Sequence, residues 1–186
     1  IALFSLAYVV FYLRDKLTRA PTYQTTGPVE FVDTKEIAKN IEEDKIVVNV
    51  PGSKALLPGA KWVPQSFNNC GPATTSMILQ YFGHNVDQNT TKAALRSNSD
   101  DKNVFTYEIA DYLKKDFNIE SKLLYNGDKD KIKSLIANGF YVLIEDYLHP
   151  NDDIGHFTII RGFDDEKGVY IADDSYLGVN IIYKYE

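Results

Sequence analysis

The spacing of hydrophobic residues predicts three helices, over residues 73–82, 106–117 and 128–138. The first is a mostly apolar run that ends at Gly83, a residue suited to the left-handed end of a helix. In the second, the apolar residues fall on one stripe and Thr106 is placed to cap the start. The third opens with Asp128, another capping residue, and stops before Gly139.

Strand patterns follow the helices, over residues 140–147, 156–163, 169–173 and 179–185. The first is an apolar run typical of a buried strand, and the next two are separated by the turn-forming stretch DDEK. Helices followed by antiparallel strands predict an α+β domain. We expect the helices of the first half to pack on an antiparallel sheet from the second half, with a cleft between them.

The first thirteen residues, IALFSLAYVVFYL, are apolar with no polar face at helical period. A helix that crosses a membrane needs about 20 apolar residues, so we expect residues 1–13 to be the end of a transmembrane segment or signal anchor. The alternative is an ordinary core helix. Proline and glycine interrupt residues 14–60, which we expect to be a linker, and residues 61–186 are expected to form the folded domain.

Composition narrows the classes of function. A net charge of −6 and a pI near 5.1 provide no positive field for nucleic acid, so we expect no nucleic-acid partner. The single cysteine excludes an internal disulfide. No glycine-rich phosphate loop is present, and the acidic runs at 152–153 and 164–166 lack the spacing of a calcium-binding loop. We therefore expect neither a cofactor nor a metal.

The lone thiol is placed where chemistry is favoured. Pro72 suits the first turn of a helix, which puts Cys70 at or just before the helix start. The free N–H groups and the positive end of the helix dipole favour the nucleophilic thiolate there, and Gly71 would leave room for a substrate. The alternative is that Cys70 is a small buried hydrophobic residue.

A thiol nucleophile needs a base, and the chain contains three histidines. His84 follows a helix stop and His149 precedes a proline, so both are expected in loops. His156 follows Gly155 at the start of an apolar strand, where a cleft would open. It is the favoured base, and its alternative role is simply to end a strand.

A base is usually oriented by a third group, and the strand that returns from the turn ends in Asp173 and Asp174. In an antiparallel hairpin its end lies beside His156, and side chains alternate between the two faces. An odd number of turn residues would put Asp174 on the histidine's face, and an even number Asp173. The other aspartate would be a surface or turn residue, and the alternative is that both are solvated.

These stretches together resemble a known family. VPQSFNNCGPATTSMILQYFG (63–83), GHFTIIRGFDD (155–165) and DSYLG (174–178) are similar to the bacteriocin-processing, double-glycine-leader cysteine peptidases of the papain-like superfamily. The resemblance runs from about residue 62 to the end, and residues 101–104 and 126–128 look like its extracytoplasmic bacterial branch. It implies a papain-like fold.

The resemblance also implies roles for individual residues. Cys70 matches the nucleophile and His156 the general base. Gln65, five residues before Cys70, matches the side-chain amide that joins the Cys70 N–H in the oxyanion hole.

At the orienting acid the family usually has Asp-Pro. Alignment from Gly178 puts Ser175 in the place of the proline and selects Asp174, which we favour. Alignment from the Tyr-Ile-Ala of residues 170–172 selects Asp173 instead.

The sequence thus predicts a membrane-tethered, papain-like cysteine peptidase that acts on a peptide or protein substrate. We expect its domain to lie outside the cytoplasm, by resemblance to the branch, although the basic flank Arg14, Lys16 and Arg19 favours the opposite orientation. Two alternatives use the same residues: a non-catalytic peptide-binding module of this fold, and a thiol acyltransferase or amidase. The resemblance does not imply double-glycine specificity, because the bacteriocin-processing members precede ATP-driven exporter domains, whereas this chain has an apolar segment in front and no nucleotide motif.

Overall fold

The computed structural model describes residues 52–96, 98, 101, 103–124, 128–147 and 155–185. The expected membrane segment, residues 1–13, and most of the expected linker, residues 14–60, lie outside these ranges. Within them, no helix has both the length and the apolar character needed to cross a bilayer. The described part contains helices and one antiparallel sheet, which confirms the predicted α+β class.

The described helices are α2 (Cys70–Tyr81), α3 (Gln88–Leu95), α4 (Thr106–Phe117) and α5 (Lys129–Ala137). Three of them confirm predicted helices, and α2 starts three residues earlier than expected, at Cys70 itself. Asp128 caps α5 as predicted, because its carboxylate accepts the Lys131 N–H at 2.8 Å. The predicted cap of α4 is wrong: Thr106 is already helical, and the Glu108 side chain accepts the Phe105 N–H at 2.7 Å instead.

Helix α3 was not predicted from the sequence. Asp87 begins it by accepting the N–H groups of Asn89 and Thr90 at 2.8 and 3.2 Å. Its sequence, QNTTKAAL, is mostly polar, and only Thr91 and Leu95 are buried. Hydrophobic spacing over eight residues is too short a signal for such a helix, whereas its aspartate cap is a detectable one.

The strands are β1 (Lys54–Leu56), β2 (Val142–Tyr147), β3 (Gly155–Asp164), β4 (Val169–Asp174) and β5 (Gly178–Lys184). They form one antiparallel sheet in the order β1-β3-β4-β5, and β2 pairs with the first half of β3 while β1 pairs with its end. The sheet therefore includes a strand from before the helices, within the stretch predicted to be a linker. The folded part begins by Lys54 rather than at residue 61.

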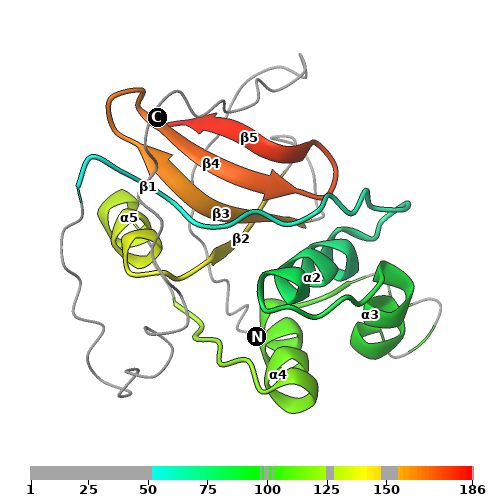
Figure 1. Cartoon of the computed structure of the whole chain (residues 1–186). Helices are drawn as coiled ribbons and strands as arrows, with labels where there is room; N and C mark the ends of the chain where they lie inside the picture. Colours follow the sequence, from blue (N-terminus) through cyan, green and yellow to red (C-terminus); the bar gives the residue numbers. More distant parts are fainter. Residues whose placement is uncertain are drawn as a thin grey trace, which may run out of the picture.

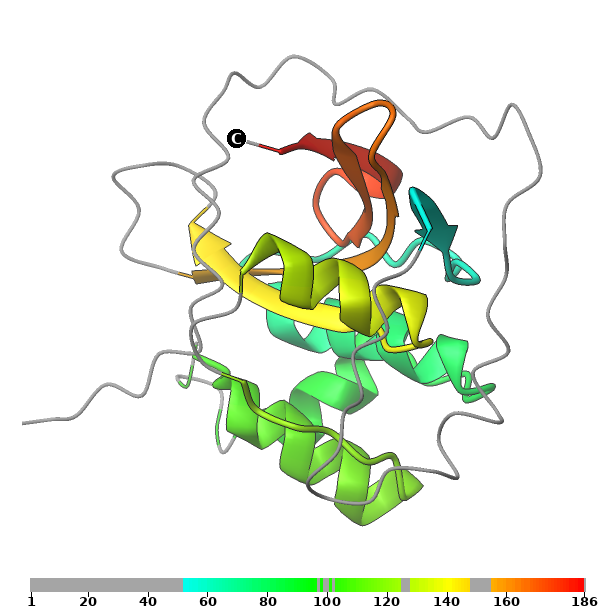
Figure 2. The ribbon, with the colours of Figure 1, turned by 90° about the vertical axis from the view of Figure 1, so that its left-hand side faces the viewer.

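Two hydrophobic clusters hold the helices against the sheet. In one, α5 packs through Ile132 and Ile136 against Phe163 of β3. In the other, Met77 of α2 packs with Phe157 of β3 and with residues of α4. Figure 1 shows α5 below one end of the sheet and α2, α3 and α4 gathered below the other, and α4 lies far from β5 in both views (Figures 1 and 2). The second cluster places the first turn of α2 near the start of β3.

Candidate active site

Cys70 is the first residue of α2, where the free N–H groups of the first turn favour an anionic sulfur. The thiol is half-buried and donates a hydrogen bond to the Gly155 carbonyl, with 3.8 Å between sulfur and oxygen. Gly71 does not leave room for a substrate, because a Cβ there would lie 3.0 Å from the Val104 Cβ. The glycine instead allows α2 to pack closely against Val104.

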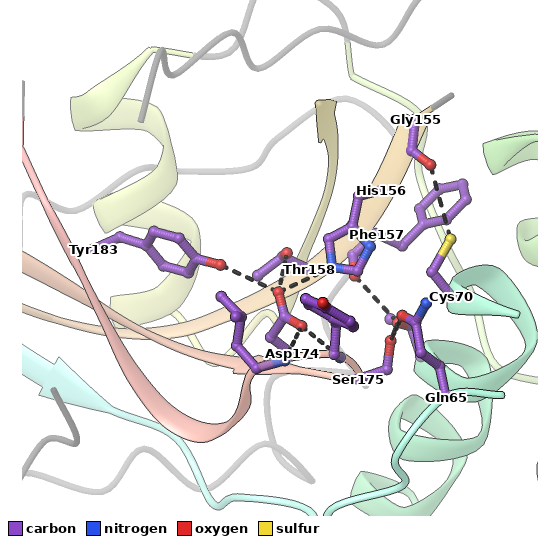
Figure 3. A network of polar contacts seen from close by, with 12 residues as sticks. Gln65, Cys70, Gly155, His156, Phe157, Thr158, Asp174, Ser175 and Tyr183 are labelled. Atoms are coloured by element: carbon purple, nitrogen blue, oxygen red, sulfur yellow. Dashed lines mark hydrogen bonds and ion pairs between the residues drawn. The ribbon is translucent and has the colours of Figure 1, made fainter. Parts of the chain in front are cut away.

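His156 is the second residue of β3 and is only 3% exposed. Its Nε2 lies 3.0 Å from Oδ2 of Asp174, and the thiol of Cys70 bonds the carbonyl of Gly155, the residue before the histidine. Figure 3 shows the imidazole between the Cys70 side chain and the Asp174 carboxylate. The ring therefore bonds the acid and lies on the side of it that faces the thiol.

These neighbours shift the pKa values of the pair in opposite directions. Burial lowers the pKa of His156, but the hydrogen bonds and charges of Asp174 and Cys70 outweigh burial and raise this pKa to about 10. Burial raises the pKa of Asp174, but the hydrogen bond and charge of His156, with two backbone N–H groups, leave it lowered. At neutral pH the pair is an imidazolium and a carboxylate.

The same shifts make stability depend on pH. The raised pKa of His156 stabilises the fold fully below its ordinary value of 6.5, and this contribution is lost as the pH rises through about 10. The lowered pKa of Asp174 stabilises the fold fully above 3.8 and is lost as the pH falls through that lowered pKa. The pair therefore stabilises the domain most between pH 3.8 and pH 6.5, the ordinary pKa values of the two groups.

The β3–β4 hairpin determines which aspartate meets the histidine. Its turn consists of Asp165–Gly168, an even number of residues, which alone would select Asp173. A β-bulge at Arg161 adds one residue to β3 and reverses the alternation, so that Asp174 pairs with Thr158, two residues after the histidine and on its face. The structure thus places the favoured aspartate beside the histidine, but the odd-numbered turn that would select it is absent.

The Asp174 carboxylate is fully buried and accepts five hydrogen bonds. Besides the histidine, the hydroxyls of Thr158 and Tyr183 donate to Oδ2 at 3.0 and 3.2 Å (Figure 3). The N–H groups of Tyr176 and Leu177 donate to Oδ1 at 2.6 and 2.8 Å. Because every donor favours the ionised form, Asp174 is held as a carboxylate in one orientation.

Asp173 is not the surface or turn residue that the sequence suggests. It is fully buried on the other side of the strand, where Oδ2 lies 2.9 Å from Nε of Arg161. The Tyr81 hydroxyl and the Ala60 N–H also donate to Oδ2, at 2.9 and 3.2 Å, and the Asn180 N–H donates to Oδ1 at 3.0 Å. Asp173 is thus the centre of a buried ion pair that joins β3, β4, β5 and α2.

Gln65 lies in the segment that leads into α2 and is half-buried. Its N–H donates to the Ser175 carbonyl at 2.9 Å, and its Oε1 accepts from the Ser175 hydroxyl at 2.9 Å. In Figure 3 its side chain rises toward the start of α2, where Cys70 lies. The structure thus brings all four predicted site residues, Gln65, Cys70, His156 and Asp174, to one junction between α2 and the sheet.

Comparison with known proteins agrees with this arrangement. Residues 57–186 match the Peptidase_C39 like family. The chain belongs to this family. No curated protein and no solved structure matched it. Membership indicates a cysteine-peptidase type of function, and it extends over the helices, the main strands and the whole site.

Several residues around the C39-like site were missed from the sequence. Thr158 was detectable, because it lies two residues after His156 on the same strand face. Trp62, whose indole Nε1 donates to the Asp174 carbonyl at 3.1 Å, gives no local signal. Asp146 was also missed; it pairs with His156 between strands β2 and β3. Burial raises the pKa of Asp146 to about 6; the charge of His156 lowers this pKa, and the charge of Asp174 raises it.

The other candidates lie apart from the site. His84 is half-buried and packs edge-on against Phe117, with ring centroids 4.9 Å apart, whereas His149 lies outside the described residues. Asp164 ends β3 and accepts the Lys167 N–H at 3.2 Å, which is turn chemistry. Among the described residues no group of three or more His, Cys, Asp or Glu side chains is arranged to hold a metal ion.

Proposed function

We propose that this chain is a membrane-tethered thiol peptidase that hydrolyses a peptide or protein substrate with Cys70 as nucleophile and His156 as base. The observation that carries the proposal is the arrangement of three groups: the Asp174 carboxylate bonds the buried imidazole, and the thiol at the start of α2 bonds the Gly155 carbonyl next to that histidine. Membership of a peptidase family adds independent support.

The first half of the reaction forms an acyl-enzyme. The Cys70 proton passes to His156, the resulting thiolate attacks the carbonyl carbon, a C–S bond forms, and the C=O electron pair moves onto oxygen. The Gln65 side-chain N–H and the Cys70 backbone N–H donate to that oxyanion. When the oxyanion collapses, the C–N bond breaks and the imidazolium gives its proton to the leaving amine.

The second half releases the acid product. The now neutral His156 takes a proton from water, and the resulting hydroxide attacks the thioester carbon. The C–S bond breaks, and the sulfur leaves as a thiolate beside the restored imidazolium. Asp174 stays ionised throughout and stabilises the protonated ring in both halves.

A peptide library tests this proposal. The full 186-residue chain is incubated with the library and new termini are read by mass spectrometry, beside Cys70→Ala and a matched His84→Ala control. We expect products from the parent and the control and none from Cys70→Ala. Unchanged products with Cys70→Ala would exclude the thiol mechanism, and bound but uncleaved peptides would favour a binding module.

The membrane tether and an extracytoplasmic domain belong to the same proposal. They are supported by the apolar run at residues 1–13 and by the resemblance of residues 101–104 and 126–128 to the extracytoplasmic branch. Protease added to intact cells should digest the domain. Full protection of the domain until lysis would reverse the orientation.

We expect alkylation of Cys70 by iodoacetamide to depend on His156. Iodoacetamide reacts with the thiolate, and His156 is the proposed base that takes the proton from this thiol. His156→Ala should therefore slow labelling at pH 6 by about tenfold or more, and His84→Ala should not. Since Cys70 is the only cysteine, mass spectrometry of the intact chain measures the rate. Equal rates in the two variants would argue against the pair.

Gln65→Ala should lower turnover by about 100- to 1,000-fold, the usual effect of removing one oxyanion donor. The change leaves Cys70 and His156 in place, so alkylation by iodoacetamide should be unaffected. Gln80→Ala is the matched control, because Gln80 lies near the other end of α2 and its side-chain oxygen accepts the exposed Lys61 N–H. Turnover of Gln65→Ala within about twofold of the parent would remove this residue from the mechanism.

A further inference from the structure

Ser175 forms two hydrogen bonds with Gln65. Its carbonyl accepts the Gln65 backbone N–H, and its hydroxyl donates to Oε1 of the Gln65 side chain, both at 2.9 Å. Ser175 is only 1% exposed, so these bonds do not compete with bulk water. It directly follows Asp174, which means that one turn of chain carries both the orienting acid and the partner of the amide.

A second hydroxyl, from α2, contacts Ser175. Thr74 Oγ1, fully buried in α2, donates toward the Ser175 hydroxyl at 3.3 Å and toward the Phe157 carbonyl at 3.2 Å. The shorter bond of the Ser175 hydroxyl is the one that it donates to Gln65 Oε1. Thr74 lies one helical turn after Cys70, so these hydrogen bonds connect the Gln65 side chain to the helix that carries the thiol.

The direction of the bond between Ser175 and Gln65 matters because a carboxamide has two different ends. Its oxygen only accepts hydrogen bonds and its NH₂ only donates them. When Oε1 is held by the Ser175 hydroxyl (Figure 3), the NH₂ is the end left to face a substrate oxygen. Rotation by half a turn would present the carbonyl oxygen to a developing oxyanion and repel it.

We propose that Ser175 is a positioning residue for the oxyanion hole, which acts by holding the Gln65 carboxamide with its NH₂ toward the reacting carbonyl. This inference rests on the proposed function. The Thr74 hydroxyl contacts the same Ser175 oxygen from α2.

Kinetics of the full chain test the proposal on a fluorogenic peptide chosen from the library products. Ser175→Ala should lower kcat by about 3- to 10-fold, the effect of one neutral hydrogen bond, with KM nearly unchanged. Ser134→Ala is the matched control, a buried serine in α5 that should keep the parent kcat. Alkylation by iodoacetamide, which forms no oxyanion, should proceed at the parent rate in Ser175→Ala.

The decisive comparison is made in the Gln65→Ala variant, which lacks the side-chain amide. If Ser175 acts through Gln65, then Ser175→Ala added to Gln65→Ala should cause no further loss. A parent-like kcat in Ser175→Ala would show that Ser175 has no role and would overturn the proposal. So would a further loss of kcat in the Gln65→Ala background or a parallel fall in the alkylation rate, because each would show a general structural role.

An NMR measurement decides the inference even if the parent cleaves no peptide, an outcome that would overturn the proposed function alone. The Gln65 side-chain NH₂ signals are identified by their loss in Gln65→Ala. In Ser175→Ala these signals should shift and show faster side-chain motion, because Oε1 has lost its donor. Signals identical to those of the parent would show that Ser175 does not hold the amide.

Discussion

Asp174→Asn should lower turnover by about 10⁴-fold, the scale seen when the acid that orients a catalytic histidine becomes an amide. The carboxylate accepts the Nε2–H of His156, which leaves the other ring nitrogen to the thiol. An asparagine that turns its NH₂ toward the ring would demand the opposite tautomer. It would also remove the negative charge that raises the pKa of His156, so less imidazolium would be present to stabilise the thiolate.

The measurement is kcat of the full chain on a cleaved fluorogenic peptide, with the pH dependence of iodoacetamide labelling as a second readout. Labelling at pH 6 should slow in Asp174→Asn because the pKa of His156 falls. Asp130→Asn, at the exposed start of α5, is the matched control and should behave as the parent. Parent-like turnover and labelling in Asp174→Asn would mean that another group orients the ring.

Thermal unfolding separates this effect from loss of the fold. Asparagine keeps one acceptor for the two backbone N–H groups at Oδ1, but it loses acceptor capacity toward Thr158 and Tyr183. Asp174→Asn should therefore unfold at a lower temperature than the parent. Its kcat should be measured well below that unfolding temperature.

The positions of Cys70 and His156 at the starts of their elements could be predicted from local sequence. Cys70 sits before Gly71-Pro72, which marks a helix start, and His156 follows Gly155 at the start of an apolar strand. Each signal depends on a few adjacent residues, and the structure places both where the pattern indicates. Gln65 needed the family resemblance, since an isolated glutamine in a loop predicts nothing.

Long-range geometry could not be predicted in the same way. The bulge at Arg161 reverses the strand alternation, and its cause is distant: Arg161 bonds Asp173, the Leu57 carbonyl at 2.6 Å and the Asn180 side chain. Strand β1 was missed for a similar reason. Lys54–Leu56 is too short for a period-2 pattern and becomes a strand only because the end of β3 is available to pair with it.

The buried Arg161–Asp173 pair leads to the prediction with the largest effect on stability. Asp173→Ala should lower the free energy of unfolding by about 3 to 5 kcal/mol, because Arg161 would stay buried without its counter-charge. That is a large share of the roughly 5 to 15 kcal/mol that holds a typical domain together. The substitution also removes the acceptor of the Ala60 N–H and of the Tyr81 hydroxyl. These two bonds hold the segment before Gln65 and the end of α2 against the sheet.

Urea unfolding of the full chain, followed by circular dichroism, measures this loss. Asp165→Ala is the matched control: its ion pair with Lys133, at 2.7 Å, is partly exposed and should cost no more than about 1 kcal/mol. The double change Arg161→Met with Asp173→Leu should recover much of the stability, because it removes both charges and leaves neither buried alone. A loss below about 1 kcal/mol in Asp173→Ala would show that water or another side chain reaches Arg161, and that the pair does not anchor the segment that carries Gln65 into the site.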